Sequence, residues 1–96
     1  MPQMKIAIVG VGDVGTTLAK RFEEAGHRIF LGVRHPNNLR PKVKKILSKN
    51  ITTYSVADAV KNADVIITSI WPTSETKKVA KEMGDVSGKV IIDAMN

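Results

Sequence analysis

Cysteine is absent from this 96-residue chain. The protein therefore has no disulfide, no thiolate nucleophile and no zinc–thiolate centre. Only two histidines are present, and together with the missing cysteines this leaves no usual set of metal ligands, so we predict no metal site. A chain without disulfides is compatible with a reducing compartment, and we expect a cytoplasmic protein.

Long apolar runs are also missing. No stretch approaches the roughly 20 apolar residues that span a bilayer, and the N-terminus lacks the pattern of a secretory signal peptide. We therefore predict no membrane partner. Aromatic residues make up only 4% of a chain that is 43% hydrophobic, so aliphatic side chains must fill the core. This composition is typical of a parallel sheet that is covered on both faces.

Acidic residues are missing from one long segment of the chain, between Glu24 and Asp58. The basic residues inside that segment are Arg28, Arg34, Arg40, Lys42, Lys44, Lys45 and Lys49. With a formal net charge of +6, the chain suits a polyanionic small molecule, a nucleic acid or an acidic membrane surface. The run from Arg40 to Lys49 has no interleaved aromatic residues for base stacking, so we predict no nucleic-acid partner. We interpret most of that run as the solvated face of a helix.

Apolar strands alternate with amphipathic helices along the chain. The predicted strands are residues 4–9, 28–33, 51–54, 64–70 and 89–93, and the predicted helices run over 13–25, 41–50, from 55 to about 63, and to 84. The helical residues expected to face inward are Val14, Leu18, Phe22, Ala25, Val43, Ile46, Leu47, Val56, Ala59, Val60, Ala63, Val79, Ala80 and Met83. Such alternation requires a parallel sheet with right-handed crossovers. We predict one domain over residues 1–96: an α/β, Rossmann-like doubly wound sheet with strand order 3-2-1-4-5.

A glycine-rich loop joins the first predicted strand to the first helix, with the pattern Gly-x-Gly-x-x-Gly. Gly10 permits the tight turn, Gly12 removes a side chain where backbone approaches a pyrophosphate, and Gly15 lets the helix pack closely on the sheet. The helix N-terminus offers unpaired N–H groups to phosphate. The candidate cofactor-binding residues of this loop are Gly10, Val11, Gly12, Asp13, Val14 and Gly15. Alternatively, the loop is a turn without a ligand, and Asp13 is only a residue of the helix start.

The end of the second predicted strand indicates which dinucleotide binds. NAD-binding domains place a carboxylate about 20 residues past the glycines, on the ribose 2′-hydroxyl. Here that position holds Arg34, and no acid lies nearby in the sequence. A guanidinium suits a 2′-phosphate, so we predict NADP(H) as the cofactor, with His35 as a further donor or a stacking partner for adenine. Alternatively, Arg34 is a solvated residue at a strand end.

The nicotinamide half should lie where the first and fourth strands end, because ligands of such sheets bind at that switch point. We name Ile70, Trp71 and Asn96 as candidates there. Trp71 suits the wall of a cofactor or substrate site or, alternatively, packs under a loop, and Asn96 is alternatively a frayed terminal residue. No acid–base pair stands out, and His27 is expected at the start of the second strand, at the edge of the sheet opposite the cofactor. Hydride transfer needs little beyond placing two rings in contact, so redox chemistry stays open.

Several segments together resemble the deazaflavin-dependent NADP reductase family of dinucleotide-binding enzymes. They are Val9–Gly15, Ala25–His27, Leu31–Arg34, Ala63–Ile66 and Gly88–Asn96. The resemblance implies the cofactor-holding part of an oxidoreductase that passes hydride between NADP(H) and a deazaflavin, a flavin or a small organic partner. It also implies a longer chain in such enzymes, which closes the active site and usually builds a dimer, so a homo-oligomer is possible.

The sequence departs from this family in three places that would contact phosphate. Val33 stands where relatives often have Ser or Thr, Asn37 and Asn38 occupy the region where some have Lys, and Val11 replaces a Thr found in some glycine loops. Each departure removes a phosphate contact and favours weaker NADP discrimination. Two other functions stay open. One is the cofactor-binding part of a prephenate- or hydroxyacid-dehydrogenase-type enzyme, and the other is a non-catalytic NAD(P)-sensing module.

Overall fold

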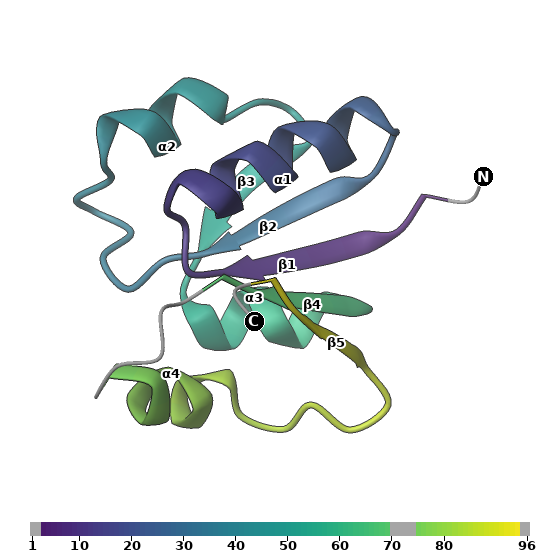
Figure 1. Ribbon diagram of the computed structural model, residues 1–96, viewed down its shortest axis with the longest axis vertical. Helices are drawn as coiled ribbons and strands as arrows, with labels where there is room; N and C mark the ends of the chain where they lie inside the picture. Colours follow the sequence, from purple (N-terminus) through teal and green to yellow (C-terminus); the bar gives the residue numbers. More distant parts are fainter. Residues whose placement is uncertain (1–2, 70–74, 95–96) are drawn as a thin grey trace.

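The computed structural model describes residues 3–69 and 75–94. Its elements alternate strictly between strand and helix (Figure 1). In chain order they are β1 (Lys5–Val9), α1 (Asp13–Glu24), β2 (Arg28–Gly32), α2 (Pro41–Ile46), β3 (Ile51–Tyr54), α3 (Val56–Asn62), β4 (Val65–Thr68), α4 (Glu75–Met83) and β5 (Val90–Asp93). Most boundaries lie within one or two residues of those predicted.

The sheet has the predicted topology. Its five strands are ordered β3-β2-β1-β4-β5, and every neighbouring pair is parallel. Val9, the last residue of β1, pairs with Gly32 of β2 and with Thr68 of β4. Three central strands therefore end in register at one edge of the sheet. The segments that follow them, including the glycine loop, leave from that carboxyl edge.

Helices cover the sheet on both faces, with α1 and α2 on one side and α3 and α4 on the other (Figure 1). The strands alternate their side chains between two cores. From β1, Ile6 and Ile8 enter the core under α1 and α2, whereas Ala7 and Val9 enter the core under α3 and α4. These small and β-branched side chains fill both cores with little aromatic contribution, as the composition predicts.

The inward faces of the helices are partly different from those predicted. Gly15 and Ala19 are the buried residues of α1, and Leu18 and Phe22 pack beside them. Val14 is 41% exposed, because it lies about 100° round the helix from Gly15. Ala25, Leu47 and Ala80 were also expected to be buried and are exposed. The remaining predicted inward residues are buried or half-buried.

Helix α2 ends at Ile46 rather than at Asn50, so this predicted boundary is wrong. The backbone of Leu47 is already extended, at φ −62° and ψ 138°. Ser48 and Ile51 then exchange backbone hydrogen bonds of 3.1 and 3.3 Å, which turn the chain into β3. Residues 47–50, which helical periodicity assigned to the helix, therefore form the turn that leads into β3.

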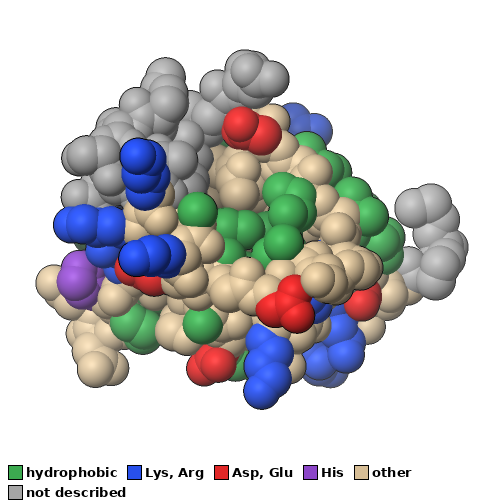
Figure 2. Space-filling model, turned by 90° about the horizontal axis from the view of Figure 1, so that it is seen from below, with side chains coloured by type: hydrophobic (Ala, Val, Ile, Leu, Met, Phe, Trp, Pro, Cys, Tyr) green, Lys and Arg blue, Asp and Glu red, His purple; other side chains and the backbone are tan. Residues whose placement is uncertain are grey.

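The β5 edge of the sheet is less covered than the doubly wound pattern predicts. Val90, Ile91 and Ile92 are 47–58% exposed, whereas the apolar side chains of β1 and β4 are buried. Apolar side chains also lie open on the face shown in Figure 2. In the described part of the chain, no helix is both long and apolar enough to cross a membrane.

Candidate cofactor-binding site

Two glycines of the loop between β1 and α1 are required by the backbone itself. Gly10 has φ +90°, a conformation that L-residues with a side chain rarely adopt. A Cβ on Gly15 would lie 2.6 Å from the Gly10 carbonyl oxygen, so a side chain there would push α1 away from the loop. The predicted roles of Gly10 in the turn and of Gly15 in close packing are confirmed.

Gly12 is different, because the fold does not require a glycine there. Its φ of −98° is open to any residue, and a Cβ built on it would meet nothing within 4 Å. Gly12 is the N-cap of α1, and no described side chain caps this helix start. An open space therefore adjoins the positive end of a helix dipole. A pyrophosphate fits such a cradle, since its oxygens would occupy the volume that a side chain would fill.

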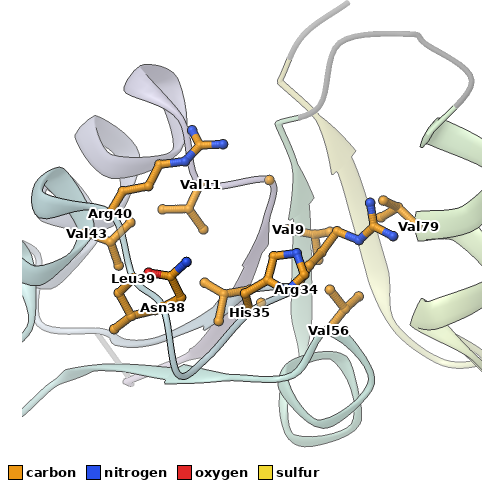
Figure 3. Close-up of a pocket in the computed structure, with 13 residues that line it drawn as sticks. Val9, Val11, Arg34, His35, Asn38, Leu39, Arg40, Val43, Val56 and Val79 are labelled. Atoms are coloured by element: carbon orange, nitrogen blue, oxygen red, sulfur yellow. The ribbon is translucent and has the colours of Figure 1, made fainter.

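A cavity of about 430 Å³ opens beside this loop at the carboxyl edge of the sheet (Figure 3). Its walls come from both helical layers and from the loop between β2 and α2. The lining residues are Val9, Gly10, Val11, Gly32, Val33, Arg34, His35, Asn38, Leu39, Arg40, Val43, Val56 and Val79. This apolar hollow with a few polar groups at its rim is the usual form of a small-molecule site. Its size and lining suit the adenosine half of a dinucleotide.

Arg34 follows the end of β2, as predicted, and it also lines the cavity. Its guanidinium points toward α4 and Val79 (Figure 3), and Nη2 lies 3.4 Å from Oε1 of Glu82. Although no acid lies near Arg34 in the sequence, the fold places one beside it. Glu82 is far away in the sequence and reaches Arg34 only through the packing of α4, a tertiary contact that no local pattern reveals. His35 also lines the cavity, beside Arg34.

Arg40 is a cavity residue that the sequence interpretation missed, because it was assigned to a solvated run. It is the N-cap of α2 and lines the cavity from the α1–α2 side. Figure 3 shows it across the hollow from Arg34. A signal was available: a helix that follows a parallel strand begins at the carboxyl edge of the sheet, so the residue before Pro41 had to lie there. Lys44, Lys45 and Lys49 are exposed, as predicted.

Asp13 and Lys42 form an ion pair beside the glycine loop. Lys42 Nζ lies 2.5 Å from Asp13 Oδ1, and the Asp13 side chain is 91% exposed. The hydrogen bond from Lys42 and its charge hold the pKa of the Asp13 carboxyl below its ordinary value. Asp13 lies outside the cavity lining, which favours its interpretation as a residue of the helix start. Val14, the other exposed loop candidate, is also absent from that lining.

The nicotinamide end of the predicted site includes residues that lie outside the described part of the chain. Ile70, Trp71 and Asn96 lie outside the described residues. Ser69, which follows β4, is buried, and its side chain lies near Gly15. His27 is buried, as expected at the opposite end of β2, where its Nδ1 accepts a 3.0 Å hydrogen bond from the Met4 N–H. Its role is structural and lies away from the cavity.

Residues 5–96 match the sequence profile of the NADP oxidoreductase, coenzyme F420-dependent family. The chain belongs to this family. It is similar to the F420-dependent NADP reductase of Methanothermobacter thermautotrophicus, with 31% identity over 95% of the chain and 42% of that enzyme. It also resembles glycerol-3-phosphate dehydrogenase [NAD(P)+] of Thermoanaerobacter sp., with 27% identity over 93% of the chain and 30% of the enzyme. The chain thus spans less than half the length of these relatives.

Solved structures show the same fold. A putative F420-dependent NADP reductase from Arthrobacter sp. superposes with a TM-score of 0.80 at 24% identity, over 94% of this chain and 44% of that one. An imine reductase from Aspergillus terreus superposes with a TM-score of 0.76 at 18% identity, over 100% of this chain and 33% of that one. The comparisons confirm the family, the Rossmann-like fold, the assignment to the NADP-dependent oxidoreductases and NADP as the family's cofactor.

Proposed function

We propose that this chain holds NADP(H) along the carboxyl edge of the sheet for a hydride transfer to or from a deazaflavin, a flavin or a small organic partner. The pyrophosphate lies over Gly12 and the start of α1, and the adenosine occupies the cavity beside Gly10 and Val11. Arg34 and Arg40 face the 2′-phosphate from two sides. The observation that carries this proposal is the open, uncapped space at Gly12, because it adjoins a cavity with two guanidinium groups on its rim.

The residues of this chain bind and orient the cofactor. Bound NADPH supplies the hydride itself. The N–H groups at the start of α1 neutralise pyrophosphate charge and fix its position, while the valine walls of the cavity exclude water from the adenine. Ile70, Trp71 and Asn96 remain our candidates for the nicotinamide end. A cytoplasmic location and a homo-oligomeric state stay predictions from the sequence.

The redox partner is the less constrained half of the proposal. The match to a family of F420-dependent enzymes supports a deazaflavin. The similarity to glycerol-3-phosphate dehydrogenases keeps a small hydroxy substrate as a second candidate. With either partner, the cofactor would be held at the same edge of this chain's sheet. A sensing module without chemistry would also use this edge, and would be recognised by cofactor binding with no hydride transfer to any partner, in the whole protein.

The cofactor assignment is tested by titrating the protein with NADPH and with NADH. A charge-assisted contact from Arg34 to the 2′-phosphate is worth about 1.5–3 kcal/mol, which corresponds to roughly a 10- to 100-fold preference for NADPH. Arg34→Asp should abolish this preference through lost bonds and repulsion, and should spare NADH. Lys49→Asp makes the same charge change at an exposed residue before β3 and should leave the ratio unchanged. Equal affinities in the parent, unaltered by Arg34→Asp, would show that Arg34 is only a surface residue.

A further inference from the structure

Helix α4 places an acid at the rim of the adenosine cavity. Val79 is 4% exposed and lines the cavity. Glu82 follows three residues later, so it lies on the same side of the helix. From there its carboxylate reaches Arg34, with 3.4 Å between Oε1 and Nη2. Arg34 thus extends from the end of β2 to α4 over the Val79 side of the cavity (Figure 3).

We propose that Glu82 competes with the 2′-phosphate of NADP(H) for Arg34 and thereby sets how strongly this chain prefers NADP(H) to NAD(H). The proposal rests on the proposed function, which assigns Arg34 to that phosphate. Both groups are anionic acceptors, and the Nη2 donors that face Glu82 are among those that a phosphate on the same edge of the guanidinium would use. NADP(H) must therefore displace or share the contact with Glu82, whereas NAD(H), which lacks the phosphate, leaves the ion pair intact.

Exposure of the ion pair makes this exchange feasible. The side chains of Arg34 and Glu82 are 42% and 38% exposed. The Glu82 carboxylate therefore regains hydrogen bonds to water when Arg34 turns to the phosphate. An exposed ion pair of this kind contributes little, because water and salt screen it. The competition is therefore modest, and we expect it to reduce NADPH affinity by about two- to fivefold. Repulsion between the Glu82 carboxylate and the phosphate acts in the same direction and falls as salt screens it.

The experiment compares Glu82→Gln, Arg34→Gln and the double variant, with Glu24→Gln as the matched control. Glu24 is exposed at the C-terminal end of α1, so its substitution makes the same charge change at the opposite edge of the sheet. Affinities for NADPH, NADH, adenosine 2′,5′-bisphosphate and AMP are measured by isothermal titration calorimetry at low and high salt. The two adenosine fragments differ in the 2′-phosphate and are tested without any redox partner.

Glu82→Gln should tighten NADPH and the bisphosphate about two- to fivefold at low salt, and should leave NADH and AMP unchanged. The gain should vanish in the Arg34→Gln background, because the competition acts through Arg34. Equal gains from Glu82→Gln and Glu24→Gln would overturn the inference, since they would report net charge alone. No gain from Glu82→Gln, with NADPH weakened by Arg34→Gln, would overturn the inference and leave the proposed function standing. If Arg34→Gln does not weaken NADPH, the phosphate assignment fails and the inference fails with it.

Discussion

Replacing Gly12 with Val should separate cofactor binding from folding. A Cβ at this position meets no atom within 4 Å, and the backbone φ of −98° suits a β-branched residue. The fold therefore accepts the substitution. The substitution should nevertheless block pyrophosphate binding, because the new side chain fills the space beside the first N–H groups of α1.

The change in stability is the sum of two opposing effects. A glycine replaced at a compatible φ loses chain entropy in the unfolded state, which stabilises the protein by about 0.4–1 kcal/mol. Gly12 is also the N-cap of α1, and an apolar residue is a poorer N-cap than glycine by about 0.5–1.5 kcal/mol. The net change should be within about 1 kcal/mol, which moves the Tm of a domain of this size by less than about 8 °C.

The loss of binding should be much larger. Displacing the pyrophosphate from the helix start removes charge-assisted hydrogen bonds worth about 1.5–3 kcal/mol each. Two such bonds correspond to at least a hundredfold rise in Kd. Both NADPH and NADH should be affected, because they share the pyrophosphate. Thermal unfolding and cofactor titration of the same preparation measure the two effects.

Gly15→Ala is the matched comparison within the same loop. Its Cβ would lie 2.6 Å from the Gly10 carbonyl oxygen and 3.3 Å from Ile8 Cγ2, so α1 must shift, at a cost of about 1–3 kcal/mol in stability. We expect a lower Tm for this variant, whereas Gly12→Val loses binding without that destabilisation. If Gly12→Val binds NADPH as tightly as the parent does, the phosphate cradle is wrongly placed.

Two further predictions concern charges around the loop. Arg40→Gln should raise the Kd for NADPH several-fold, because Arg40 lines the cavity from the side opposite Arg34. Arg21→Gln, which removes a charge at the exposed C-terminal end of α1, should leave this Kd unchanged. Equal effects of the two substitutions would show that Arg40 acts only through the net charge of the protein. The lowered pKa of Asp13 means that its ion pair with Lys42 stabilises the fold at neutral pH and is lost as the pH falls through that lowered pKa. The Tm advantage of the parent over Asp13→Asn should therefore shrink on acidification, and an advantage that persists at low pH would contradict this origin.

Sequence periodicity was sufficient to predict the strand order of the sheet, but it could not predict which side chains line the cavity. Strand order follows from alternation and crossover handedness, and the roles of Gly10 and Gly15 follow from steric rules that act within a few residues. Arg40 lines the cavity and Glu82 contacts Arg34 because of where the helices dock. Glu82 meets Arg34 only once α3 and α4 have packed on the sheet, so no spacing in the sequence encodes the contact. The nicotinamide candidates fall outside the described residues and stay predictions.

The departures from the family pattern have a packing explanation that bears on cofactor choice. Val11 and Val33, where the resemblance to the reductase family implies a hydroxyl side chain in some members, are partly buried and pack against the core under α1 and α2. They extend the apolar wall of the cavity in place of contributing phosphate donors. In the proposed site, phosphate recognition then depends on Arg34, with Arg40 opposite it and Glu82 as the proposed competitor. A site with one principal cation and a nearby acid should discriminate weakly, so we expect a preference for NADPH nearer 10-fold than 100-fold.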